Sequence, residues 1–394
     1  MIAILADDLS GALDTAVVFQ LRGASTVVRP DSHTDNPLSQ DTIDVVAWNI
    51  NDRHAHATDA RARVVDCLSG TERLYMKIDS TLRGPVGAQI DAVMEGTSRY
   101  RSALVCPAFP ENGRTVVRGH LYVHGRPLEQ TALAQDPENP MGSGNIVEIL
   151  RRTSRRTVKA LPFDQLSLVE HPVGIYVVDA QTSDDLDRLA RYLTAHPEVL
   201  PVGSAGLARA LGEIWISGRT VPNPHDSLGP VDQILALVGS LHPTTREQVI
   251  RAQTGGSWEV WKPVIGSAPV EIHPNARAVM LTTPIDRIQG ASGVLDAMVH
   301  VAASQVQREL GHGRRLAVIA TGGDTALGFL RHLSVAALRP KSELAPGVVL
   351  SVADIEGQPL LFITKSGAFG GPDFFDWVHH RFARHCSERR SVTS

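Results

Sequence analysis

The sequence predicts an α/β protein of two domains, each built on a largely parallel sheet. Short apolar runs alternate with amphipathic segments, which is the pattern of βαβ units. The chain has 394 residues, more than one hydrophobic core usually organises. A stretch with three prolines and two glycines separates the halves at residues 217–230. We therefore expect a domain at residues 1–216, a linker at 217–230 and a second domain at 231–394.

The first domain is expected to alternate strands with helices. Apolar runs that stop at polar or glycine residues indicate the strands, and helical periodicity indicates the helices. Residues 116–144 have little periodicity and are expected to form a long irregular segment. The strands are expected at 2–6, 25–28, 44–49, 74–79, 103–107, 174–179 and 200–203. The helices are expected at 12–21, 58–68, 86–94 and 204–211, with a further helix capped by Ser183.

Three strands of the second domain lead into glycine or hydroxyl residues. They are expected at 233–239, 316–320 and 360–364. A helix opened by Thr244 or Thr245 follows the first of them, and the last helix is expected at 373–382. Because open parallel sheets bind ligands beyond the carboxyl ends of their strands, the turns after these strands are candidate binding loops.

Composition argues against several classes of partner. A net charge of −4 gives no basic surface for nucleic acid or anionic lipid, and no apolar run is long enough to span a bilayer. Met1 is followed at once by a strand-like run, so we expect no signal peptide. Cys67, Cys106 and Cys386 have neither a metal spacing nor a disulfide framework. A cytoplasmic protein that binds a small molecule fits these observations best.

Acidic residues follow the first expected strand. Asp7 and Asp8 come directly after it, and Asp14 lies near one helical turn further on. Capping of the next helix, together with Ser10, explains the two neighbouring acids as well as a binding role does. Adjacent strand residues point to opposite faces, so we expect Asp7 and Asp8 to have different roles.

A polar cluster follows the strand at 74–79, where Asp79 is joined by two hydroxyl residues. A guanidinium offers two parallel donors to a carboxylate and an ammonium adds point charge, so nearby cations suit the carboxyl end of a small sugar acid. Single cations in loops are more often solvated surface charges, and this alternative stays open. The hydroxyl residues are Ser80 and Thr81, and the cations are Arg53, Lys77 and Arg83.

The glycine turns of the second domain suit phosphate. Exposed backbone amides at a helix start attract anions, and the helix dipole adds partial positive charge. Glycines after strands also make ordinary turns, but two such loops and the Ser240 turn in one domain favour binding. Neither a Walker loop nor a GxGxxG fingerprint occurs in the chain. The candidate phosphate-binding residues are Ser240, Thr321, Gly322, Gly323, Asp324, Thr325, Lys365, Ser366 and Gly367.

Five motifs, spread over both halves, resemble those of the four-carbon acid sugar kinases. They are ADDLSGALD at 6–14, KIDSTLRG at 77–84, CPAFPENGR at 106–114, TGGDT at 321–325 and KSGAFG at 365–370. The resemblance implies an N-terminal domain for the sugar acid, a C-terminal domain for ATP and an active-site cleft between the domains. Two departures are Leu9-Ser-Gly in place of Phe-Thr-Gly, and Ala368 in place of a glycine, which puts the geometry of the last loop in question.

The resemblance also implies site residues. At the acid it places Asp8, Arg53, Lys77, Asp79, Ser80, Thr81 and Arg83, to which we add Asp7. At ATP it places Ser240, Gly322, Gly323, Asp324, Thr325 and Gly367.

The expected reaction is phosphoryl transfer from ATP, with Mg²⁺, to the 4-hydroxyl of threonate, erythronate or a 3-oxo-tetronate. Asp8 is the preferred base, with Asp79 the runner-up, while Asp7, Asp14 or Asp324 could hold the metal through water. A non-catalytic sugar-acid-binding or regulatory protein is the alternative, and the missing GxGxxG argues against a dehydrogenase. The sequence leaves open the choice of acid and the oligomeric state, with a homo-oligomer among the alternatives.

Overall fold

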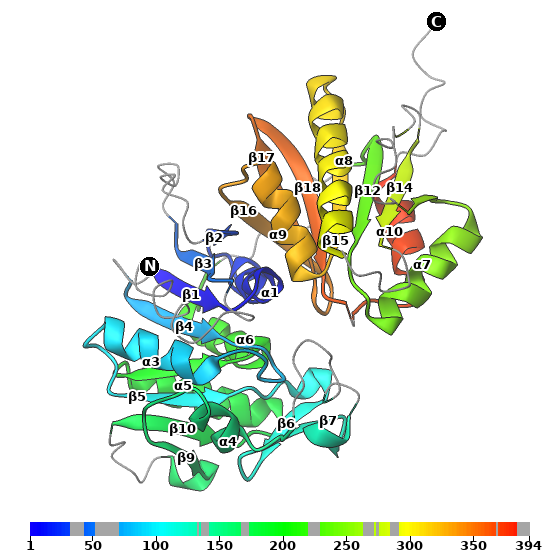
Figure 1. The fold of residues 1–394 in the computed structure, drawn as a ribbon. Helices are drawn as coiled ribbons and strands as arrows, with labels where there is room; N and C mark the ends of the chain where they lie inside the picture. Colours follow the sequence, from blue (N-terminus) through cyan, green and yellow to red (C-terminus); the bar gives the residue numbers. More distant parts are fainter. Residues whose placement is uncertain are drawn as a thin grey trace, which may run out of the picture. The chain divides into compact units, whose positions relative to one another are not determined.

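A computed structural model of the chain describes residues 1–31, 43–51, 71–131, 134, 142–166, 173–219, 229–262, 272, 276–283, 291–367 and 369–383. Contacts divide the chain into two compact units, Met1–Pro222 and Asn223–Ser394, called unit 1 and unit 2 below. Each unit contains strands and helices of its own, and Figure 1 labels them. The predicted α/β class is therefore confirmed. The helix expected at 58–68 and most of the linker expected at 217–230 lie outside the described residues.

The sheet of unit 1 is parallel throughout the described residues. Its order is β2–β3–β1–β4–β11–β5–β10–β9, and every neighbouring pair is parallel. Most of its strands are buried on both faces, which is why they read as continuous apolar runs. The strands are β1 (Ile2–Ala6), β2 (Thr26–Arg29), β3 (Val45–Asn49), β4 (Arg73–Lys77), β5 (Ser102–Cys106), β9 (Val158–Leu161), β10 (Gly174–Val178) and β11 (Val199–Gly203).

The described helices of unit 1 begin at side-chain caps, except α3, which follows Pro85. Asp8 caps α1 and Ser204 caps α6 by accepting backbone amides. Thr182, rather than the expected Ser183, caps α5, because its hydroxyl forms a reciprocal capping box with Asp185. Helices α1 and α5 both pack against α6 (Figure 1). The helices are α1 (Leu9–Gln20), α3 (Val86–Gly96), α4 (Ile146–Arg151), α5 (Ser183–Ala195) and α6 (Ala205–Trp215).

The expectation of an irregular segment at 116–144 is wrong for its first part. A small antiparallel sheet is formed by β6 (Arg114–Val117), β7 (His120–Val123) and β8 (Arg126–Pro127). Its two tight turns, Arg118-Gly119 and His124-Gly125, have positive φ at all four residues. Such turns normally carry Asn-Gly or Asp-Gly, so arginine and histidine at the first position concealed the hairpins in the sequence.

The sheet of unit 2 has parallel and antiparallel parts. The order is β13–β14–β12–β15–β18–β17–β16, parallel from β13 to β18 and antiparallel from β18 to β16. Its strands are β12 (Gln233–Val238), β13 (Glu259–Trp261), β14 (Ala278–Thr282), β15 (Leu316–Thr321), β16 (Leu338–Ala345), β17 (Val348–Ile355) and β18 (Gln358–Lys365).

Four helices of unit 2 flank this sheet. They are α7 (Pro243–Gly255), α8 (Ala291–Gly311), α9 (Gly323–His332) and α10 (Phe374–Phe382). Helix α8 packs against α9, and α7 packs against α10 (Figure 1). The phenylalanines of α10 belong to the hydrophobic core. Helix α7 begins one residue before the expected Thr244, because Pro243 suits the first helical position and His242 is the cap. No helix in the described ranges is long and apolar enough to cross a membrane.

Candidate active site

Strand register aligns the polar strand ends of unit 1 along one edge of its sheet. The parallel pairings place Asn49, Ala6, Lys77, Gly203 and Cys106 side by side on β3, β1, β4, β11 and β5. The residues that follow these strands therefore meet at the carboxyl edge, where parallel α/β sheets bind ligands. The acids after β1 and the polar cluster after β4 lie on adjacent strands of this edge.

Asp8 and Lys77 converge on Gly11. Asp8 Oδ1 accepts the Gly11 amide at 2.7 Å, which confirms the expected cap. A Cβ on Gly11 would stand 2.7 Å from that oxygen and 2.8 Å from Lys77 Nζ, so only glycine lets both groups approach the helix start. The buried Lys77 Nζ donates to the Ile78 carbonyl at 2.9 Å. Asp7 is buried whereas Asp8 is partly exposed, so the neighbouring acids have different environments.

Asp79 organises the loop after β4. Its Oδ2 accepts Arg83 Nε at 2.8 Å, and its Oδ1 accepts Arg83 Nη2 at 3.0 Å, which is a bidentate pair. Oδ2 also accepts the amides of Thr81 and Arg83, both at 3.3 Å, and the Thr81 hydroxyl. Leu82 has a φ of +64°, an uncommon conformation for a residue with a Cβ. Both carboxylate oxygens of Asp79 are thus committed to holding this tight turn.

Ser80 and Arg53 are the other two predicted site residues of unit 1 to be placed. Ser80 is partly exposed beside the buried Thr81, and Arg53 lies outside the described residues. No group of three or more His, Cys, Asp or Glu side chains in the described ranges could hold a metal ion. Within these ranges Asp7 and Asp14 are not part of such a group, although Mg²⁺ in kinases usually needs only one or two carboxylates besides phosphate.

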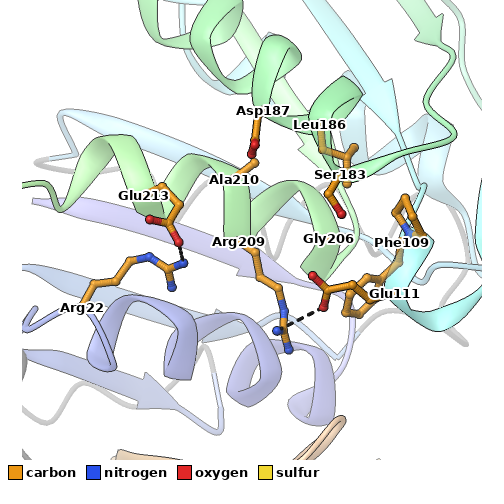
Figure 2. A pocket seen from close by; sticks show the side chains of 11 residues that line it. Arg22, Phe109, Glu111, Ser183, Leu186, Asp187, Gly206, Arg209, Ala210 and Glu213 are labelled. Carbon is orange, nitrogen blue, oxygen red and sulfur yellow. Dashed lines mark hydrogen bonds and ion pairs between the residues drawn. The ribbon is translucent and has the colours of Figure 1, made fainter.

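A cavity of about 280 Å³ in unit 1 contains none of these residues (Figure 2). Its two arginines are each paired with a glutamate, Arg22 with Glu213 and Arg209 with Glu111. Asp187 adds another acid to the lining, so negative groups outnumber positive ones. A sugar acid is itself negative and would gain no net electrostatic attraction there. We therefore place the candidate site at the strand ends rather than in this cavity.

Strand register also aligns the glycine loops of unit 2. Thr282, Val238, Thr321 and Lys365 lie side by side on β14, β12, β15 and β18. Loops after the last three of these strands therefore share the carboxyl edge of the sheet. Gly322 follows Thr321 with a φ of +95°, a region that favours glycine, and its amide donates to the Lys365 carbonyl at 3.1 Å.

Close approaches require two further glycines in these loops. A Cβ on Gly239 would stand 2.0 Å from Thr325 Oγ1, and one on Gly367 would stand 2.5 Å from Ser240 Oγ. Both distances are far below normal contact, so a side chain at either glycine would displace a hydroxyl. The loops after β12, β15 and β18 thus bring bare backbone and hydroxyl donors together, which is the composition of a phosphate site.

The start of α9 contains two other predicted residues. Gly323 is the first residue of the helix, and Asp324 is exposed in its first turn. An exposed acid beside a phosphate site is suited to water-mediated contact with Mg²⁺. Ala368, which the sequence singled out in the last loop, lies outside the described residues.

Lys365 is a buried cation without a described carboxylate partner. Its Nζ donates to Thr245 Oγ1 at 3.1 Å and to the carbonyls of Gly367 at 3.2 Å and Ser366 at 3.4 Å. Burial lowers the pKa of Lys365 to about 8. The side chain also lies 5.7 Å from the ring centre of Phe374. A buried ammonium held only by neutral acceptors would be stabilised by a bound anion.

Two residues of α7 that the sequence did not single out for the site hold the last loop. Thr245 Oγ1 donates to the Gly367 carbonyl at 2.7 Å. Gln248 Nε2 donates to the carbonyls of Phe369, Gly370 and Gly371 at 3.2, 3.0 and 2.8 Å. Both residues contact a loop more than 120 positions away in sequence. No local pattern could have predicted these contacts.

Two family models match the chain, one in each half. The first, described as a sugar-binding N-terminal domain, matches residues 2–211, and the second, described as a nucleotide-binding C-terminal domain, matches residues 235–375. The chain is 33% identical to a D-threonate kinase of Bordetella bronchiseptica, over 99% of this chain and 98% of that protein. The chain belongs to the four-carbon acid sugar kinase family.

Another relative is named for a different four-carbon acid. The chain is 28% identical to a 3-oxo-tetronate kinase of Cupriavidus necator, over 98% of each protein. Among solved structures, a Haemophilus influenzae protein superposes with a TM-score of 0.73 at 21% identity, over 96% of this chain and 100% of that one. That likeness concerns the fold alone, and it agrees with the α/β architecture described above.

Proposed function

We propose that this four-carbon acid sugar kinase transfers the γ-phosphoryl group of ATP to the 4-hydroxyl of threonate, erythronate or a 3-oxo-tetronate. The acid would bind at the carboxyl edge of unit 1 and ATP at that of unit 2. The observation that carries the proposal is the fully buried Lys365, which is held by neutral acceptors. It lies beside loops where close approach requires Gly239 and Gly367, and positive φ favours Gly322. The descriptions of the two family models support a sugar site in unit 1 and a nucleotide site in unit 2. The names of the relatives support the kinase reaction.

Phosphoryl transfer depends mainly on positioning and on neutralising charge. The glycine amides, the Thr325 and Ser240 hydroxyls and the Lys365 ammonium are the donors that unit 2 offers to phosphate oxygens. When bound, Mg²⁺ would neutralise charge on the β- and γ-phosphates, with Asp324 as the proposed water-mediated contact in unit 2.

We assign the base to Asp8. Its carboxylate is partly exposed next to the buried Lys77 ammonium, whereas both oxygens of Asp79 are engaged by Arg83. In this role Asp8 accepts the proton of the attacking hydroxyl, and Asp79 keeps the loop after β4 in shape.

An ATP-consumption assay tests the function. Purified protein is offered D- and L-threonate, D- and L-erythronate and 3-oxo-tetronates, and release of ADP is measured with and without each acid. We expect one acid to raise ADP release well above the background without acid. Failure of every acid, together with no ATP binding by calorimetry, would leave a non-catalytic sugar-acid-binding protein as the better reading.

The Asp8→Asn variant tests the base. Asparagine is as good a helix cap as aspartate, so the fold and the binding of the acid should be retained. We expect kcat to fall by about 10²- to 10⁴-fold with little change in the dissociation constant of the acid. The control is Asp184→Asn at an exposed position on α5, which should leave kcat unchanged. Retention of most of the wild-type kcat in Asp8→Asn would exclude Asp8 as the base.

We propose the cytoplasm as the location, because ATP is supplied there and the described Cys106 is an unpaired thiol. The expected homo-oligomer stays a prediction, and light scattering of the purified protein measures it.

A further inference from the structure

Arg83, one of the three cations that the sequence predicted to bind the acid, already has a carboxylate partner. Arg83 directs its Nε and Nη2 atoms at the two oxygens of Asp79, at 2.8 and 3.0 Å. This is the edge of a guanidinium that would otherwise bind a carboxylate with two parallel hydrogen bonds. A four-carbon sugar acid carries one carboxylate, so a cation other than Arg83 has to neutralise it if Arg83 keeps its partner. The predicted Arg53 lies outside the described residues, and Arg114 is a described candidate.

Arg114 is held at the same edge by a chain of short contacts. Its backbone pairs with Phe109, with N–O distances of 2.8 and 3.0 Å across the tight loop that follows β5. That loop is fixed to the end of β11, because Ser204 Oγ donates to the Ala108 carbonyl at 2.8 Å. The preceding Gly203 carbonyl in turn accepts the Ile78 amide at 2.9 Å, next to Asp79. Arg114 therefore begins β6 close to the strand ends where Asp79 lies.

The Arg114 side chain is partly buried, and no ion pair joins it to a carboxylate in the described part of the chain. Its Nη1 donates to the Asn112 carbonyl, and its buried Nε has no hydrogen-bond partner there. Burial lowers the pKa of Arg114, and the negative charge of Asp79 opposes that change. Leaving a charged donor buried and unmatched is costly, so such a group is more often found where a ligand completes it.

We propose that Arg114 binds the carboxylate of the sugar acid, with Lys77 and Asp8 left to meet the hydroxyl end. This assignment rests on the proposed function. It divides Arg83 and Arg114 by task, because Arg83 holds the loop through Asp79 while Arg114 has no ion-pair partner among the described residues. It also predicts selection of an acid over the neutral sugar alcohol of the same length, since the alcohol would leave the guanidinium without a carboxylate.

Binding measurements on Arg114→Gln test the proposal without requiring turnover. Calorimetry would compare the accepted four-carbon acid with the corresponding neutral tetritol. We expect the acid to bind about 30-fold more weakly than to the wild type, because charge-assisted hydrogen bonds are lost. The dissociation constants of the tetritol and of ATP should not change. The control is Arg126→Gln, an exposed arginine of the same small sheet, which should bind the acid normally.

Three results would overturn the assignment. They are unchanged acid binding in Arg114→Gln, equal weakening of acid and tetritol, and a comparable rise in the dissociation constant of ATP. If Arg114→Gln does not fold, Arg114→Lys decides, because lysine keeps the charge but loses the bidentate geometry. The lysine variant should weaken acid binding several-fold, and wild-type affinity would refute the assignment. A wild type that binds the acid but never consumes ATP with it would refute only the proposed function.

Discussion

The buried Lys365 predicts how ATP use depends on pH. Only the ammonium form attracts phosphate, and the pKa of Lys365 in the free protein is about 8, compared with 10.5 for an unperturbed lysine. The ratio kcat/KM reports ionisations of the free enzyme. We therefore expect kcat/KM for ATP to be level below pH 8 and to fall towards tenfold per pH unit above it.

The same pKa sets the energetic cost of the charged lysine. A shift from 10.5 to about 8 corresponds to about 3 kcal/mol, since one pKa unit is worth about 1.4 kcal/mol. Below pH 8 both the folded and the unfolded chain hold the proton, so the full cost is present. Between pH 8 and 10.5 the unfolded chain holds more protons, so the Lys365 contribution to the free energy of unfolding rises with pH. Stability and ATP use should thus change in opposite directions across this range.

Steady-state kinetics between pH 6.5 and 9.5, at saturating sugar acid, measure the effect on ATP use. Lys365→Met should lower kcat/KM for ATP and remove the fall above pH 8. Lys341→Met, at an exposed position on β16, is the matched control and should keep the wild-type profile. A wild-type profile that stays level to pH 9.5, or an equal fall in Lys365→Met, would refute the role of the Lys365 ammonium.

Two further predictions concern the loops around the strand ends. Gly367→Ala should raise the KM for ATP about tenfold with little change in acid binding, because the new Cβ would lie 2.5 Å from Ser240 Oγ. Gly311→Ala, which meets nothing within 4 Å, is the control and should leave the KM unchanged, and an equal effect of both would contradict the reasoning. Asp79→Asn removes the negative charge that pairs with Arg83, so we expect it to destabilise unit 1 by about 2 kcal/mol. Thermal unfolding measures this change. Unchanged stability with a large loss of kcat would instead make Asp79 the base.

Local patterns predicted much of the fold and part of the site. Buried parallel strands are continuous apolar runs, so β1 was placed without error and β4 and β5 to within two residues at either end. The hairpins of β6–β8 were missed because their turns depend on positive φ at Arg118 and His124, which residue type did not reveal. Asp8 was recognised as a cap or a ligand-facing acid, and it is the cap of α1.

The sequence by itself determined the α/β class, and its motif order indicated the family to which the chain belongs. These properties follow from periodicity and from motifs, which are local in the chain. Only the tertiary structure decided which charges are available. Arg83 and Arg114 look alike in sequence, yet Arg83 is neutralised by Asp79 and Arg114 has no described carboxylate partner. Pairing depends on which strand ends the register brings together, and burial decides the energy of a charge left unpaired.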